Sequence, residues 1–195
     1  MEKLDIKFDL SRESLEEKPL SSTPIFDGKV LHVRLDKVTL PNGVRSTREY
    51  CHHNGAVCVI PLTDEGEVIC VRQYRYPFHE DLLEIPAGKL DSPNEDPNDA
   101  VRRELREETG AVAKKIVYLG KYYPSPAILD ECIYMYLATG LEFGDTEFDD
   151  DEFIESVRVP LAKLCDLTLE GKIRDGKTQI AALRAQMMID RGLLD

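Results

Sequence analysis

No stretch of the 195-residue sequence approaches the roughly 18 consecutive apolar residues that suggest a membrane span. Residues 1–20 are charged throughout and lack the apolar run of a signal peptide. The five cysteines are odd in number and contain no Cys-x-x-Cys pair, which is typical of reduced thiols packed as small apolar side chains. These absences predict a cytoplasmic protein.

Positive charge is also scarce, with 25 lysine and arginine residues against 37 aspartate and glutamate residues, a formal net charge of −12. This acidity argues against a nucleic-acid polymer or an anionic membrane as partner, because both would repel the chain. A small anionic substrate stays compatible if bound cations or a few arginines reverse the field locally. The length and the 42% apolar content fit one domain with a core, or one domain with a small appendage.

The amino-terminal part predicts a small antiparallel sheet. Residues 1–23 show little pattern and indicate a polar lead-in. Alternating apolar positions in 29–40, followed by a Pro-Asn-Gly turn and a second arm, predict a sheet over 24–52. A change of parity between Leu35 and Val38 indicates a β-bulge.

The rest of the chain mixes short apolar strands with two helices. The clearest helix has Asp96 as N-cap, Pro97 at its first position and Gly110 at its end. The second covers residues 178–191. Strands are predicted at 56–62, 68–71, 82–85, 117–119, 133–138 and near Val157, and this mixture indicates an α/β or α+β fold rather than a helix bundle.

Three carboxylates share one face of the first helix. At 100° per residue, Glu104, Glu107 and Glu108 fall within an arc of roughly 100°. Like charges so close repel each other, more strongly when partly buried, and Arg103 can neutralise one of them but not three. Hard divalent cations such as Mg²⁺ meet this need, because they take oxygen ligands from carboxylates, water and substrate phosphates. The alternative on this helix alone is a solvated acidic face held by salt bridges.

The wider segment resembles the Nudix box, Gly-x5-Glu-x7-Arg-Glu-U-x-Glu-Glu-x-Gly-U, where U is a bulky aliphatic residue. The positions that match are Glu95, Arg103, Glu104, Leu105, Glu107, Glu108 and Gly110. Six residues rather than five separate Gly88 from Glu95, and Ala111 stands at the last aliphatic position. Neither departure touches the carboxylates.

Over about residues 26–183 the chain resembles the ADP-ribose pyrophosphatase branch of the Nudix family. The resemblance rests on VRQYR at 71–75, EIPAGK at 84–89 and YPSP at 123–126. Pro126 lies sixteen residues after Gly110, where this branch carries its marker proline. Ala127 follows where the branch usually has glycine, which leaves the shape of the loop open.

The resemblance implies hydrolysis of the pyrophosphate bond of a nucleoside diphosphate sugar, with Mg²⁺ or Mn²⁺ as cofactor and ADP-ribose as substrate. The products would be AMP and ribose 5-phosphate. The implied metal ligands are the main-chain carbonyl of Ala87 and the carboxylates of Glu104 and Glu108, with Glu107 as a further ligand or as support for a bridging water. The substrate-binding positions it implies are Arg48, Arg75, Ser125, Pro126 and Glu131.

In this branch the general base usually comes from an acidic loop late in the chain, a place that Asp149-Asp150-Asp151-Glu152 occupies here. Ungapped matching puts Asp150 at the base and Glu152 at an additional acidic metal ligand. Because aspartate is one methylene shorter than the glutamate expected there, we favour Glu152 as the base and keep Asp150 as the alternative. The run also fits a loop that is merely solvated.

The implied fold is a Nudix α/β/α sandwich over residues 53–195, with a mixed sheet between helices, preceded by a small antiparallel β appendage over residues 1–52. In relatives that appendage builds a homodimer, and the resemblance therefore implies a homodimer here.

Rival substrates within the same chemistry are another sugar nucleotide, a dinucleoside polyphosphate or a damaged nucleotide. The lack of a four-cysteine zinc pattern counts against the zinc-carrying NADH-cleaving branch, and the marker loop disfavours nucleotide-pool sanitation. A rival of another class is a non-catalytic nucleotide-binding regulator, which should have lost one or more of the box carboxylates. All three are present, and metal-dependent product release would separate the two classes.

Overall fold

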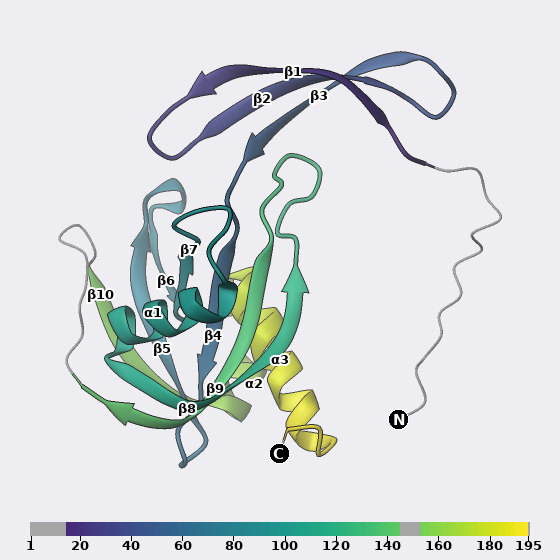
Figure 1. Ribbon diagram of the computed structural model, residues 1–195. Coiled ribbons are helices and arrows are strands. Elements are labelled where there is room, and N and C mark those ends of the chain that lie inside the picture. The colour runs from purple at the N-terminus through teal and green to yellow at the C-terminus, as the bar shows by residue number, and fades with distance from the viewer. Residues whose placement is uncertain (1–14, 145–152, 195) are drawn as a thin grey trace. The chain divides into compact units, whose positions relative to one another are not determined.

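The computed structural model describes residues 15–144 and 153–194 (Figure 1). The chain divides into two compact units, Met1–His53 with Ala127–Asp130, and Asn54–Pro126 with Glu131–Asp195. The candidate bases Asp150 and Glu152 lie outside the described residues. No helix in the described ranges is long and apolar enough to cross a membrane.

The amino-terminal unit contains an antiparallel sheet in the order β1 (Lys18–Asp27), β2 (His32–Thr39) and β3 (Arg45–His52). One sequence prediction is wrong here. Residues 18–23 are not a lead-in but part of β1, a strand whose ten residues are all exposed and which therefore lacks the alternation that marks a half-buried strand. A β-bulge was predicted between Leu35 and Val38. The pairing of β1 with β2 has a register shift opposite Lys37 and Val38, with the extra residue in β1 between Pro19 and Ser21, whereas β2 pairs with β3 in continuous register.

The larger unit contains two sheets. The mixed sheet has the order β7 (Ala87–Lys89), β4 (Ala56–Pro61), β9 (Ile133–Phe143) and β8 (Ala111–Tyr122), with β4 parallel to β9 and antiparallel to β7. The antiparallel sheet has the order β10 (Ile154–Pro160), β5 (Glu67–Arg75) and β6 (Glu80–Glu84). A 3-10 turn, Tyr76–Phe78, joins β5 to β6.

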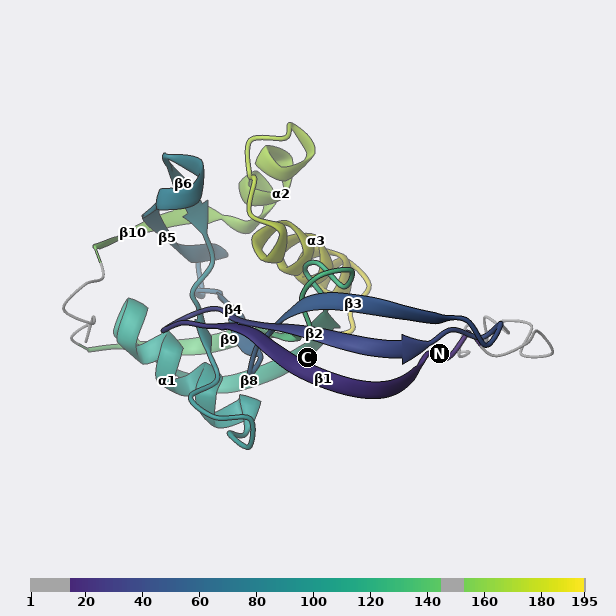
Figure 2. The ribbon, with the colours of Figure 1, turned by 90° about the horizontal axis from the view of Figure 1, so that it is seen from above.

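Strand β4 explains the layering, because all six of its residues are buried. Val57 and Val59 pack with α1 (Pro97–Thr109), while Cys58 and Ile60 belong to the core that includes α3 (Gly176–Asp190). Figure 2 shows α1 and α3 on opposite sides of β4 and β9. The predicted α/β/α sandwich is confirmed, and a strand buried on both faces accounts for the unbroken apolar run in the sequence.

The helix predictions succeeded where local signals were strong. Asp96 caps α1 by accepting a hydrogen bond from the Asn98 main-chain nitrogen at 2.8 Å, and Gly110 ends it with φ of 67°. Helix α2 (Leu161–Leu169) was missed because Pro160 stands at its N-cap without a side-chain hydrogen bond. The five cysteines are free thiols, and Cys58, Cys70 and Cys165 are buried.

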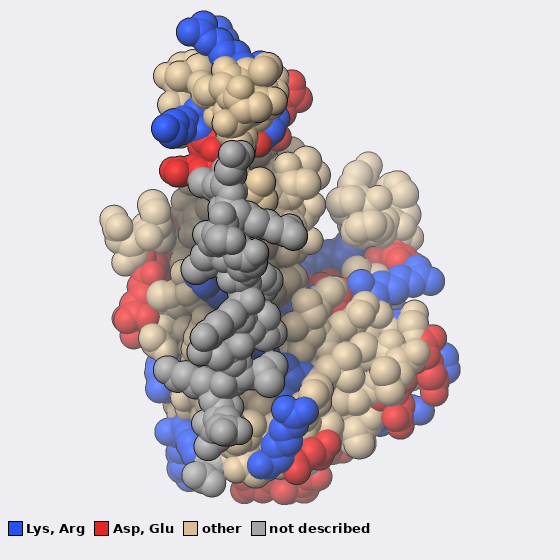
Figure 3. All heavy atoms as spheres, turned by 90° about the vertical axis from the view of Figure 1, so that its right-hand side faces the viewer, with Lys and Arg blue, Asp and Glu red and all other residues tan. Residues whose placement is uncertain are grey.

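Both signs of charge are spread over the surface despite the net charge of −12. In the space-filling view of Figure 3, lysine and arginine side chains lie among aspartate and glutamate side chains on the face shown. Local ion pairs, rather than the overall field, therefore decide the electrostatics of any one site.

Candidate active site

The buried face of α1 contains two carboxylates. Glu104 is 8% exposed and Glu108 is 4% exposed, alongside apolar residues such as Leu105 at 1%. Glu107, on the same side of the helix, keeps about a third of its side chain exposed, 35%. The arc predicted from helical spacing is thus present, and its carboxylates are removed from water to different degrees.

Glu104 lies directly against the main chain of β7. A Cβ atom added to Gly88 would stand 1.9 Å from Cδ of Glu104, a distance that real atoms never show. Any larger residue at position 88 would therefore displace the Glu104 carboxylate from its present position. The sequence identified Gly88 only as the first residue of the Nudix motif.

Arg103 is one of three arginines on this helix and contacts its carboxylates. Its Nη1 donates to Glu104 at 2.6 Å and to Glu107 at 3.1 Å, and its Nη2 donates to Glu95 at 3.4 Å and to the Lys89 carbonyl at 3.2 Å. Burial lowers the pKa of Arg103, but the charge and hydrogen bond of Glu104 outweigh burial and the pKa lies above its ordinary value. One guanidinium thus donates hydrogen bonds to three carboxylates and lies 3.6 Å from a fourth, that of Asp91, although its single charge balances only one of them.

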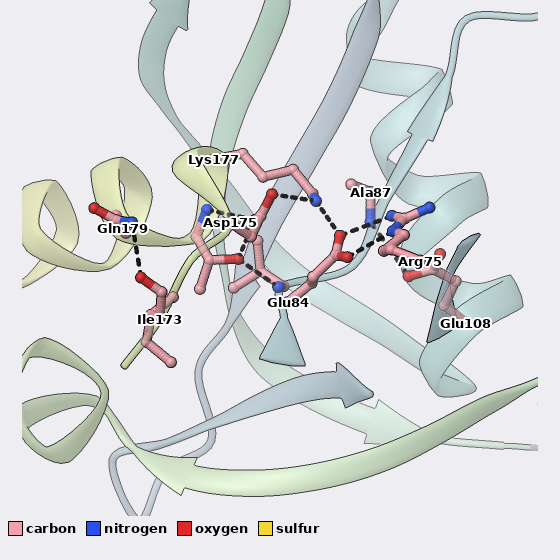
Figure 4. Close-up of polar contacts among 10 residues, drawn as sticks. Arg75, Glu84, Ala87, Glu108, Ile173, Asp175, Lys177 and Gln179 are labelled. Atoms are coloured by element: carbon pink, nitrogen blue, oxygen red, sulfur yellow. Dashed lines mark hydrogen bonds and ion pairs between the residues drawn. The ribbon is translucent and has the colours of Figure 1, made fainter. Parts of the chain in front are cut away.

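Glu108 faces the turn between β6 and β7. Its Oε2 accepts a hydrogen bond from the Ala87 main-chain nitrogen at 3.2 Å. The same turn is joined to β4, because the Val59 nitrogen donates to the Pro86 carbonyl at 3.0 Å. The end of α1 and the turn that carries Ala87 are therefore in direct contact, as Figure 4 shows for Glu108 and Ala87.

Arg75 lies at the end of β5 and binds Glu84 through two parallel hydrogen bonds, of 2.6 Å from Nε and 2.7 Å from Nη2. Glu84 is 1% exposed and also pairs with Lys177 of α3 (Figure 4). Burial raises the pKa of Glu84, but the hydrogen bond from Arg75 and the charge of Lys177 outweigh it, and the pKa lies below its ordinary value. Glu84 is therefore an ionised carboxylate held between two cations.

Sequence reasoning missed Glu84 and Lys177. A carboxylate in the apolar segment 82–85 was a usable signal, because a buried charge requires a partner. Nothing in the sequence points to Lys177, which lies 93 residues from Glu84.

The substrate-loop predictions fall between β8 and β9. Ser125 is half-buried and Pro126 is exposed at the start of a turn, while Glu131 is half-buried at its end. Within the amino-terminal unit, Asp130 accepts a hydrogen bond from the His53 main-chain nitrogen at 2.7 Å and contacts Nδ1 of His52 at 2.7 Å. Asp130 thus joins the loop segment Ala127–Asp130 to the end of β3, a contact that the sequence did not predict.

Arg48 lies on β3 in the amino-terminal unit. Its guanidinium donates to the Thr47 carbonyl at 2.8 Å and pairs with Glu17. Its side chain is 45% exposed. Within that unit Arg48 therefore makes ordinary surface contacts.

The donor set suits a hard divalent cation, because it consists of carboxylate oxygens and a main-chain carbonyl. Within residues 15–144 and 153–194, no three acidic, histidine or cysteine side chains are gathered closely enough to hold an ion as they lie. The physical reason is visible in the contacts above: Glu104 and Glu107 face Arg103, and Glu108 faces Ala87. These are the residues that could hold a cation, and Arg103 is the group with which it would compete.

The chain is similar in sequence and in structure to known proteins. The family described as NUDIX domain matches residues 52–183, and the family described as nucleoside diphosphate sugar hydrolase N-terminal domain matches residues 17–50. The chain is 41% identical over 177 residues to ADP-ribose pyrophosphatase of Bacillus subtilis (strain 168), covering 90% of this chain and 95% of that protein. It is 40% identical over 174 residues to the methanol dehydrogenase activator of Bacillus methanolicus, covering 88% and 94%. A crystal structure of an ADP compounds hydrolase superposes with a TM-score of 0.79 at 25% identity, covering 94% of this chain and 100% of that chain.

Proposed function

Because this chain belongs to the Nudix hydrolase family, we propose that it hydrolyses the pyrophosphate bond of ADP-ribose and releases AMP and ribose 5-phosphate. The observation that carries the proposal is the pair of carboxylates Glu104 and Glu108, four residues apart on α1, each less than a tenth exposed and each facing the Ala87–Gly88 main chain. A nucleoside diphosphate sugar as substrate is supported by the sugar-hydrolase family that matches the amino-terminal unit and by the Bacillus subtilis relative.

Nudix hydrolases generally use divalent metal ions. We assign Mg²⁺, with Mn²⁺ as a substitute, to the carboxylates of Glu104, Glu107 and Glu108 and to the Ala87 carbonyl. When bound, such ions supply neutralisation of the diphosphate charge and a lowered pKa of the attacking water. The burial of Glu104 and Glu108 supports this assignment, since buried carboxylates are stabilised by cations.

The chain's own groups account for the remaining chemistry. The water oxygen forms a bond to one phosphorus, the bond from that phosphorus to the bridging oxygen breaks, and the leaving phosphate keeps the electron pair. Glu152 accepts the proton of the water, with Asp150 as the alternative base. Nε and Nη2 of Arg75 hold Glu84, so we assign its Nη1 to the non-bridging oxygens of the diphosphate.

Recognition of the rest of the substrate is assigned to the loop between β8 and β9 and to the amino-terminal unit. We propose that Ser125, Pro126 and Glu131 contact the ribose and phosphate region and that Arg48 adds a charged contact. The bonds of Asp130 to His52 and His53 support a fixed loop, because they remove freedom from its backbone.

We further propose a homodimer in which residues 1–52 form the dimerisation segment and residues 53–195 form the hydrolase domain. The exposed apolar side chains of the amino-terminal unit support it, since a sheet with such a surface usually has a partner. They are Leu20, Ile25, Phe26, Val30, Leu31 and Val44, each 51–57% exposed. Light scattering coupled to gel filtration measures the mass directly, and a monomer at micromolar concentration would contradict this part.

The function is tested by product release from ADP-ribose, ADP-glucose, GDP-mannose, NADH, diadenosine polyphosphate and 8-oxo-dGTP, each with Mg²⁺ and with EDTA. ADP-ribose is expected to be cleaved most efficiently, to give AMP, and to be stable in EDTA. Faster cleavage of another compound would support the hydrolase function but would assign a different substrate. Binding of ADP-ribose without release of any product would favour a regulator, a role for which the Bacillus methanolicus relative is named.

A further inference from the structure

The first turn of α3 contacts the candidate active site at Glu84 and Ile85, and Figure 4 shows Lys177 of this turn on the side away from Glu108 of α1. Asp175 is its N-cap and accepts a hydrogen bond from the Thr178 main-chain nitrogen at 2.9 Å. The hydroxyl of Thr178, which is 0% exposed, donates to the same carboxylate oxygen at 2.5 Å. That bond fixes the hydroxyl so that its lone pairs face away from Asp175.

The hydroxyl oxygen of Thr178 then accepts a hydrogen bond from the main-chain nitrogen of Ile85 at 2.9 Å. Ile85 is 0% exposed and follows the last residue of β6. A buried N–H group in such a place is costly when it has no acceptor. Thr178 provides the acceptor from a helix 93 residues away in the sequence.

The turn from Glu84 to Ala87 is therefore held between two helices. The main-chain N–H groups of Ile85 and Ala87 point in different directions. That of Ile85 donates to Thr178 of α3, and that of Ala87 donates to Glu108 of α1. Pro86, between them, has no N–H to donate. Ile85 lies two residues before Ala87, so its position bears on the proposed cation ligands through Pro86, whose carbonyl also accepts a hydrogen bond from the Val59 nitrogen of β4 at 3.0 Å.

Lys177, the residue before Thr178 in α3, contacts the part of the candidate active site that contains Glu84 and Arg75. Lys177, 8% exposed, pairs with Glu84 and lies 3.0 Å from Asp175, and Glu84 in turn binds Arg75 (Figure 4). Burying charged and hydroxyl groups is a poor way to gain stability alone, because apolar packing of equal volume often does as well. The polar contacts to Glu84 and Ile85 are directional, and they therefore hold individual atoms at defined positions, which apolar packing does not.

We propose that Thr178 is a positioning residue of this hydrolase: its hydroxyl, oriented by Asp175, fixes Ile85 and thereby the Pro86–Ala87 turn against which Glu108 lies. The inference rests on the proposed function, because it takes Ala87 and Glu108 to be ligands of the divalent cation. It adds a side chain outside the Nudix box to the groups on which cation binding depends.

The test compares Thr178→Val, which keeps the shape and removes the hydroxyl, with Thr178→Ser, which keeps the hydroxyl. Gln179→Ala is the matched control, because Gln179 lies in the same turn of α3 and donates instead to the Ile173 carbonyl at 2.8 Å (Figure 4). Binding of Mn²⁺ to the substrate-free protein is measured by electron paramagnetic resonance. Turnover of ADP-ribose is measured separately at saturating Mg²⁺.

We expect Thr178→Val to weaken Mn²⁺ binding by about tenfold and to lower kcat by a similar factor, the effect typical of residues that orient metal ligands. Thr178→Ser and Gln179→Ala should keep the wild-type Mn²⁺ affinity within about twofold, even where they lower the melting temperature. Should Thr178→Val fail to fold, Thr178→Ala removes the same hydroxyl without adding bulk and carries the same expectation.

Wild-type Mn²⁺ affinity and kcat in a folded Thr178→Val protein would overturn the inference, as would an equal loss of Mn²⁺ affinity in Gln179→Ala. A wild-type protein that binds Mn²⁺ but cleaves none of the six compounds would overturn the proposed function alone. The Mn²⁺ comparison would still decide the role of Thr178 in that case.

Discussion

Glu104 and Gly88 occupy adjoining space that leaves no room for a side chain on the glycine, because an added Cβ would lie 1.9 Å from Cδ of Glu104. The contact joins the middle of α1 to the middle of β7. The Glu104 carboxylate occupies the space that a side chain at position 88 would fill. Glycine is favoured here for steric reasons rather than for its backbone conformation.

Gly88→Ala is therefore expected to displace Glu104 and to lower kcat for ADP-ribose by about a hundredfold, as misplacement of a catalytic group by about 1 Å does. Gly144→Ala is the matched control, since its nearest neighbour would be an ordinary 3.7 Å away. Steady-state kinetics and circular dichroism on both variants make the comparison. Wild-type turnover in a folded Gly88→Ala protein would show that Glu104 does not need its present position.

Glu108→Gln should keep the fold and lower turnover by at least about tenfold, because the amide lacks the charge that a divalent cation requires. The amide oxygen can still accept the hydrogen bond from Ala87, so the local structure is preserved. Glu142→Gln removes a similar charge from an exposed pair with Lys114 and should leave turnover unchanged. Equal turnover in both variants would remove Glu108 from the metal site.

Replacement of the two candidate bases separates them. Glu152→Gln is expected to lower kcat by about a hundredfold or more and to remove the acidic limb of the pH–rate profile, because the proton acceptor is lost. Asp150→Asn should retain that limb. The reverse result, in which only Asp150→Asn loses the limb, would reassign the base to Asp150.

Glu84→Gln tests the ion-pair network through stability. The folded pKa of Glu84 lies below its unfolded value of about 4.3, so the ionised form stabilises the fold above that pH, and the stabilisation is lost as the pH falls through the folded pKa. The variant should be about 3 kcal/mol less stable at pH 7, because Lys177 stays buried with one partner fewer. Urea unfolding at pH 7, 5 and 3.5 should show the difference shrinking only at the lowest pH, and a constant difference would mean that Glu84 is not ionised.

The cysteines should react in an order set by burial. Burial raises the pKa of Cys58 and of Cys70 to about 12, so neither forms appreciable thiolate at pH 8. Half-buried Cys51 and Cys132 are expected to be alkylated first by iodoacetamide, with the buried thiols reacting only in denaturant. Peptide mass spectrometry after timed quenching identifies each site, and early labelling of Cys58 would contradict the packing of β4.

The sequence was informative wherever the controlling interaction is local. Asp96 and Gly110 define α1 because capping needs only neighbouring residues, and helical spacing alone places Glu104 and Glu108 on one face. The apolar runs of β4 and β9 likewise indicate buried strands. These features, together with the motif resemblance, sufficed for the fold class and for the proposed reaction.

The features that sequence reasoning missed depend on contacts between distant segments. Thr178 and Lys177 meet Ile85 and Glu84 across 93 residues, and no local pattern encodes such a pairing. Strand β1 was missed for a related reason: it is defined by its pairing with β2 rather than by burial of its own side chains. The contact of Asp130 with β3 belongs to the same class.

Arg103 has a practical consequence for handling the protein. Its guanidinium contacts Glu95, Glu104 and Glu107. Part of the repulsion among these carboxylates is therefore offset by a positive charge that belongs to the chain itself and stays when the metal is removed. Chelation should therefore switch off turnover without denaturing the chain, unlike the small zinc modules that unfold when stripped of metal. A preparation purified in chelating buffer should regain full activity as soon as the cation is added back, with no refolding step.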